Sequence, residues 1–145
     1  MYFVNRAKIE EILNYMEKIQ SEYKQHSFSD FAELLLLERL THLSVEAIID
    51  VGNMMIDGFI MRDPGSYEDI IDILTDEKVL PVDEQEGYKR FIQLRKVVVQ
   101  HYTNIPHTDV EKVWNDQWTS IENFPVRVRE YLDNELGPVS AFSKN

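Results

Sequence analysis

The chain contains no cysteine, and it has only five glycines and five prolines among its 145 residues. Without cysteine there can be no disulfide bonds, thiolate nucleophiles or sulfur-rich zinc sites. The low glycine and proline content, with 43% hydrophobic residues, is typical of a compact globular protein rather than a disordered chain. Charges interrupt every apolar run before it reaches membrane-spanning length, and the N-terminus lacks the layout of a signal peptide. We therefore expect a soluble, cytoplasmic protein with no membrane segment.

Positive charge is also scarce, because 15 Lys and Arg residues face 26 Asp and Glu residues and give a net charge of −11. This balance favours solubility and disfavours broad, sequence-independent binding to nucleic acid, including DNA. Any contact with RNA or a nucleotide must therefore be local, or must be built across a subunit interface.

One window lacks acidic residues altogether. The 22 residues between Glu86 and Asp109 contain no Asp or Glu. They do contain four basic residues (Lys89, Arg90, Arg95 and Lys96), two of the four histidines (His101 and His107), and Tyr102. A permanent cation, a group that titrates near neutrality and a phenol are the chemistry that a phosphodiester requires. The window is therefore the candidate functional region.

Apolar residues recur at helical spacing along the chain, and they predict five helices and no strand. Expected helix starts are an N-cap at Asn5, a start near Ser29, and capping boxes at Ser66–Asp69, Asp83–Glu86 and Thr108–Glu111. The fourth helix should end near residues 104–106, and the fifth should continue through Pro125 to Gly137. These elements predict an all-α fold, an antiparallel up-and-down bundle of four to five helices. We expect one domain, residues 1–137, and a C-terminal tail, residues 138–145.

The second expected helix is apolar around most of its circumference at Leu34–Leu37. Such a helix is buried on several sides, either in the centre of a bundle or against a second subunit. Gly52 and Gly58 lie in the same helix, where each costs about 1 kcal/mol relative to alanine. They indicate a close approach between helices, through packing or through dimerisation.

The acid-free window places its chemistry near a helix end. On a continuous helix Arg95 and Tyr102 would lie within about 20° of each other, whereas His101 would face away. His101 could come round if the helix ended or bent before Pro106, which forces an end nearby. A ribonuclease-like centre is one interpretation, in which the histidine moves a ribose 2′-OH proton and the arginine stabilises charge at phosphorus. The other interpretation is that these side chains are only solvated surface charges and a polar residue at the helix end.

Arg95, His101 and Tyr102 resemble the hallmark of HepT-like toxins of the HEPN ribonuclease group. That hallmark is an arginine, four to six residues, a histidine, one residue and a tyrosine. Four further segments resemble the family in the same order, namely residues 37–57, 63–74, 94–105 and 107–114. The ending ELGPVSAF is similar to that of the YutE-like branch.

The resemblance implies a HEPN-like helical homodimer with the motif helices at its interface. It also implies a metal-independent endoribonuclease toxin that needs no cofactor. Arg95, His101 and Tyr102 would be catalytic, and Lys89, Arg90, Lys96 and Gln100 would support RNA binding. The expected partner is an MntA-type nucleotidyltransferase antitoxin that adenylylates Tyr102.

The chain departs from the family at the histidine. If Tyr102 takes the family's tyrosine position, the catalytic histidine position is Gln100, which cannot titrate. If His101 is the histidine instead, Tyr102 follows it without the intervening residue. The chain could therefore be a degenerate interaction module, or the substrate-binding subunit of a nucleotidyltransferase. A plain helical dimerisation protein is a further alternative.

A polar stripe on the second helix has two interpretations. Glu38, His42, Glu46 and Asp50 follow one another at intervals of four and share a face. They could hold a divalent metal, but one straight helix usually supplies two ligands. Hydrogen bonds and ion pairs are the favoured interpretation, some of them to Arg95 or Lys96, because the family's motif helix packs beside this one.

Overall fold

The computed structural model describes residues 3–137, which form six α-helices, one short 3₁₀ turn and no strand. The helices are α1 (Arg6–Lys24), α2 (Phe31–Gly58), α3 (Tyr67–Asp76), α4 (Gln85–Gln100), α5 (His107–Asp116) and α6 (Trp118–Leu136), and the turn η1 spans Val82–Glu84. The prediction of an all-α fold is confirmed. The proposed tail, residues 138–145, lies outside the described residues. None of the helices within residues 3–137 is long and apolar enough to cross a bilayer.

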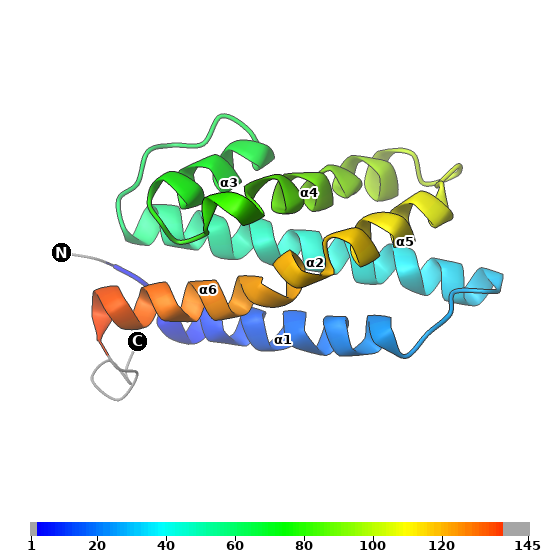
Figure 1. Ribbon diagram of the computed structural model, residues 1–145, viewed down its shortest axis with the longest axis horizontal. Helices are drawn as coiled ribbons and strands as arrows, with labels where there is room; N and C mark the ends of the chain where they lie inside the picture. The colour runs from blue at the N-terminus through cyan, green and yellow to red at the C-terminus, as the bar shows by residue number, and fades with distance from the viewer. Residues whose placement is uncertain (1–2, 138–145) are drawn as a thin grey trace.

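The long elements run in alternating directions (Figure 1). α1 and α4 point one way, and α2 and the α5–α6 pair point the other, as an up-and-down bundle requires. α2 is the central column, about 42 Å long at 1.5 Å per residue, and it packs against α1, α3 and α4. The start of α2, the end of α4 and the start of α5 lie at one end of the bundle.

Side-chain caps set the start of three helices. Asn5 and Ser66 accept hydrogen bonds from the backbone N–H groups of Lys8 and Asp69, as the sequence predicts. α2 begins two residues later than expected, because Asp30 is its cap. α2 ends at Gly58.

The two other predicted capping boxes are wrong. α4 follows a 3₁₀ turn, and the side chain of Asp83 caps nothing. Glu84 is buried there instead, and it accepts hydrogen bonds from Tyr88 at 2.8 Å and from Arg127 at 2.9 Å. α5 starts at His107 behind Pro106 without a side-chain cap, so Thr108 is already inside the helix. Tertiary contacts and the fixed backbone of proline decide both starts.

The predicted fifth helix is two helices, because the chain breaks at Gln117. The two halves are tied to different neighbours. Trp114 of α5 donates to Thr41 of α2 at 2.8 Å, whereas the carbonyl of Ile121 in α6 accepts from Gln20 of α1 at 3.1 Å. That carbonyl lies four residues before Pro125, which has no N–H to offer it, so α6 continues through Pro125 as predicted.

The close helix approach at Gly52 is confirmed. A Cβ atom there would lie 2.4 Å from Cγ2 of Ile70, so α2 and α3 could not keep their present separation. This contact fixes α3 against the central column. It thereby positions the start of α3, where Ser66 and Tyr67 face the candidate site.

Candidate functional site

Arg95 lies in the last turns of α4 and is held from two sides. Its Nε donates to Oε1 of Glu46 on α2 at 2.6 Å. Its guanidinium carbon lies 4.8 Å from the ring centroid of Tyr67 at the start of α3, which is cation–π distance. The hydrogen bond to Glu46 raises the pKa of Arg95 above its usual value despite partial burial, so the side chain stays charged.

A hollow of about 260 Å³ opens beside this arginine. It is lined by Ser66, Tyr67, Glu68, Ile92, Gln93, Arg95, Lys96 and Gln100. We call it the Arg95 hollow. The first turn of α3, at the positive end of its helix dipole, borders the hollow with Ser66, Tyr67 and Glu68. Two cations and a helix N-terminus could bind a phosphate, although the negative charge of Glu68 offsets one of the two positive charges.

The helix ends before the histidine. α4 stops at Gln100, and His101 has the non-helical angles φ −109° and ψ 38°. A projection on a continuous helix therefore does not apply to Tyr102. His101 is exposed, and Tyr102 is 68% exposed. Neither side chain makes a hydrogen bond to the part of the chain that the structure describes, so both are available to a ligand or a partner.

Two of the four basic residues of the window are engaged by acids outside it. Lys89 pairs with Asp72 of α3 at 2.6 Å, and Arg95 pairs with Glu46. Arg90 is exposed but does not line the Arg95 hollow. Of the expected supporting residues, the structure brings only Lys96 and Gln100 to that hollow.

The polar stripe of α2 makes ion pairs, as favoured from sequence. Glu46 holds Arg95, and Glu38 lies 2.6 Å from Nε2 of His107 at the start of α5. These contacts attach both ends of the segment that carries His101 and Tyr102 to the central helix. Within residues 3–137, no three His, Asp or Glu side chains are grouped to hold a metal ion.

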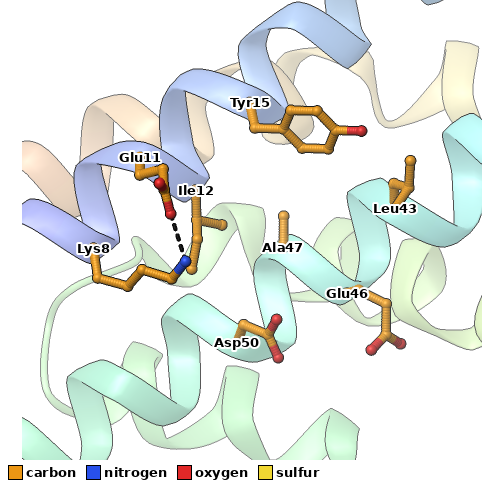
Figure 2. Close-up of a pocket in the computed structure, with 8 residues that line it drawn as sticks. All are labelled: Lys8, Glu11, Ile12, Tyr15, Leu43, Glu46, Ala47 and Asp50. Carbon is orange, nitrogen blue, oxygen red and sulfur yellow. Dashed lines mark hydrogen bonds and ion pairs between the residues drawn. The ribbon is translucent and has the colours of Figure 1, made fainter.

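A second, larger hollow of about 470 Å³ lies between α1 and α2 (Figure 2). Ile12, Tyr15, Leu43 and Ala47 form its apolar part, and Glu11, Glu46 and Asp50 make it acidic. Its one cation, Lys8, pairs with Glu11. Burial and, secondarily, Glu46 raise the pKa of Asp50, as expected for crowded carboxylates. This hollow repels a phosphate, so the Arg95 hollow is the candidate site.

The family description "Ribonuclease HepT-like" matches residues 9–128, which include the whole candidate site. The chain belongs to this family. YutE of Bacillus subtilis (strain 168) is 46% identical over 144 residues, covering 98% of this chain and 99% of YutE. The solved structure of YutE, a cytosolic protein of unknown function, superposes with a TM-score of 0.94 over 97% of this chain and 99% of that one.

More distant solved structures share the fold. One is a toxin–antitoxin with AMP-PNP, with a TM-score of 0.65 and 18% identity, covering 86% of this chain and 93% of that one. Another is a tri-AMPylated HEPN toxin from Shewanella oneidensis in complex with an MNT antitoxin. It also has a TM-score of 0.65 and 18% identity, covering 86% of this chain and 92% of that one. The HEPN-like bundle predicted from sequence is confirmed.

Sequence reasoning did not identify Tyr67. The capping box at Ser66 placed this tyrosine in the first turn of a helix, but no local pattern shows that this turn meets Arg95. The signal is tertiary, because it depends on the packing of α3 against both α2 and α4.

Proposed function

We propose that this HepT-like protein is a metal-independent endoribonuclease. The observation that carries the proposal is Arg95, which Glu46 and Tyr67 hold beside Lys96 and Gln100, six residues before an exposed His101. Arg95 would stabilise the charge that develops on the phosphorus-centred transition state. His101 would accept the proton of the ribose 2′-OH as that oxygen attacks phosphorus. The bond from phosphorus to the 5′-oxygen would then break, which leaves a 2′,3′-cyclic phosphate, and the departing 5′-oxygen would take a proton from His101 or from water. The exposed turn after α4 would let the imidazole approach the same phosphate.

The experiment that tests this function is incubation of purified protein with total RNA in EDTA. We expect cleavage to persist at full chelation, because side chains supply both the base and the cation. If the wild-type protein cleaves no RNA, the ribonuclease hypothesis is rejected and the degenerate interaction module is favoured. Gln100 at the family's histidine position supports that alternative.

The proposed enzyme is a homodimer. Phe31 and Leu35 are 75% and 47% exposed on the first turns of α2, and Leu34 and Leu36 are only partly buried. These residues lie at the end of the bundle where α4 ends (Figure 1). Pairing through this surface would bring two sets of Arg95, His101 and Tyr102 together and double the local positive charge.

Sedimentation at micromolar concentration tests the dimer, and it should give about twice the chain mass of 17.1 kDa. Leu35→Glu should shift the protein to monomer and lower the cleavage rate with it, because a buried charge without a partner opposes association. A wild-type protein that is monomeric and still cleaves RNA would contradict an active site built from both subunits.

A nucleotidyltransferase antitoxin of the MntA type is the proposed partner, and Tyr102 its acceptor. The exposed phenol, which makes no hydrogen bond to the described chain, leaves room for modification. The AMPylated toxin from Shewanella oneidensis supports this choice of partner. AMP on Tyr102 would place a bulky anion near Arg95 and exclude an RNA phosphate by charge and by size.

After incubation with ATP and a cognate nucleotidyltransferase, mass spectrometry should show added AMP on the wild-type chain. Tyr102→Phe should abolish the addition, because it removes the acceptor oxygen alone. Tyr15→Phe is the matched control, since Tyr15 is also exposed but lies in α1. AMP that persists in Tyr102→Phe would assign the acceptor to another residue.

A further inference from the structure

Tyr67 borders two separate hollows. One is the Arg95 hollow, and the other, of about 420 Å³, is lined by Asn53, Pro64, Gly65, Ser66, Tyr67 and Ile70. We call this 420 Å³ hollow the Tyr67 hollow; it is distinct from the hollow between α1 and α2. The two share Ser66 and Tyr67 and no other lining residue. Arg95 borders only the first, so the guanidinium does not occupy the second.

The lining of the Tyr67 hollow suits a flat, weakly polar group. Pro64 and Tyr67, a residue that is 46% exposed, supply apolar surface, whereas Ile70 is 1% exposed and adds little. Asn53 of α2 supplies an amide that can both donate and accept hydrogen bonds. No charged side chain lines it. Its volume lies in the range of small-ligand sites, which are mostly apolar with a few polar groups.

The segment that carries Tyr67 is held in place. Ser66 caps α3 by accepting from the N–H of Asp69 at 3.0 Å. The carboxylate of Asp69 accepts from the N–H of Gly65 at 2.8 Å and from both terminal nitrogens of Arg62, and these contacts lower the pKa of Asp69 to about 2. The carboxylate therefore stays charged well below neutral pH, and the turn before Tyr67 keeps its shape. A ligand would find the ring already placed.

We propose that the Tyr67 hollow binds a nucleobase of single-stranded RNA next to the phosphate held by Arg95. This inference rests on the proposed ribonuclease function and adds its base-recognition site. Proteins that bind single strands combine cations for the backbone with aromatic rings on which bases stack. Here the ring that contacts the arginine is also the wall of the neighbouring hollow, so phosphate and base would be bound by one connected unit. The Asn53 amide would contact the edge of the base.

The test measures binding without cleavage. The probe is a fluorescein-labelled 2′-O-methyl oligoribonucleotide of mixed sequence and about nine nucleotides, which has no free 2′-OH to react. A matched set of probes carries one abasic residue at each position in turn. Fluorescence anisotropy in EDTA gives the dissociation constant of each probe for the wild-type protein and four variants.

Two variants perturb the hollow and two are their matched controls. Tyr67→Ala removes the ring, and Tyr67→Phe keeps it. Gly65→Leu fills the hollow from the side away from Arg95, whereas Gly65→Ala adds only a Cβ, whose nearest neighbour is Oδ2 of Asp69 at an ordinary 3.7 Å. Gly65→Leu keeps the contact between Arg95 and Tyr67, so it separates loss of the base site from loss of support for the arginine.

We expect an abasic residue at one position to weaken wild-type binding about 10-fold, a typical effect of losing one stacked base. Tyr67→Ala and Gly65→Leu should weaken binding of the intact probe similarly and should make it insensitive to that abasic residue. Tyr67→Phe and Gly65→Ala should behave like the wild type. An equal abasic effect in Gly65→Leu and in the wild type, with cleavage of ordinary RNA intact, would overturn the base site alone. If the wild-type protein shows no abasic effect, binds no RNA and cleaves none, the proposed ribonuclease function is overturned as well.

Discussion

Replacement of His101 by alanine should lower the rate of RNA cleavage about 10²–10⁴-fold, the usual contribution of a general acid–base. An imidazole can both accept and donate a proton, and the only other acid–base side chain in residues 101–106 is the phenol of Tyr102. Gln100→Ala should lower the rate only modestly, because an amide can hydrogen-bond a phosphate but cannot take the proton of the ribose 2′-OH. Initial rates on one labelled RNA in EDTA compare the two variants.

Gln100→His is the complementary change, because it restores the histidine at the family's spacing from Tyr102. Gln100 lines the Arg95 hollow and His101 does not, so a histidine at residue 100 would start closer to the phosphate. We expect a faster enzyme. Cleavage that occurs only in Gln100→His would contradict a role for His101 and would show a natural chain that keeps the fold but has lost the nuclease.

Arg95→Ala should reduce cleavage about 10²–10³-fold, the effect of removing one group that stabilises transition-state charge. Arg95→Lys should not restore the rate, because an ammonium cannot hydrogen-bond Glu46 through Nε while stacking on Tyr67. Arg90→Ala is the matched control, since it removes an arginine from the same helix outside the hollow. A similar loss in Arg90→Ala and Arg95→Ala would indicate general electrostatic attraction instead of a specific role.

The variant Glu46→Gln tests whether Glu46 only positions the arginine or also acts on the substrate. It keeps a hydrogen-bond acceptor but removes the negative charge, so Arg95 should remain in place with more of its charge available to RNA. We expect RNA to bind more tightly and the cleavage rate to change by less than 10-fold, well below the loss in Arg95→Ala. A loss as large as that of Arg95→Ala would make Glu46 part of the chemistry.

The elements that were predictable from sequence are those that local chemistry decides. Asn5 and Ser66 cap helices because their side chains reach the next N–H groups, whatever the rest of the fold does. Asp83 and Thr108 offered the same pattern and failed. Glu84 is drawn into a buried network with Arg127, and Pro106 fixes the start of α5, so contacts distant in sequence override the local signal.

The candidate site was predictable to a similar degree. The acid-free window contains Arg95, Lys96 and Gln100, and the structure brings all three to the Arg95 hollow. The expectation that Tyr102 continues the helical face of Arg95 was wrong, because α4 ends at Gln100. The side chains that hold the arginine, Glu46 and Tyr67, come from α2 and α3, and only packing brings them to α4. Periodicity predicts which face a residue occupies but not which residue faces it.

In the proposed mechanism, Arg95 and His101 cleave RNA through the 2′-OH without a metal. The most direct measurement is cleavage in EDTA of one end-labelled RNA and of the same strand with a single 2′-deoxy residue at the cleaved linkage. We predict that the wild-type protein cuts the first and leaves a 2′,3′-cyclic phosphate, that it spares the second, and that Arg95→Ala cuts the first about 10²–10³-fold more slowly. Equal cleavage of both strands would contradict attack by the 2′-OH, and activity that EDTA abolishes would contradict cleavage without a metal.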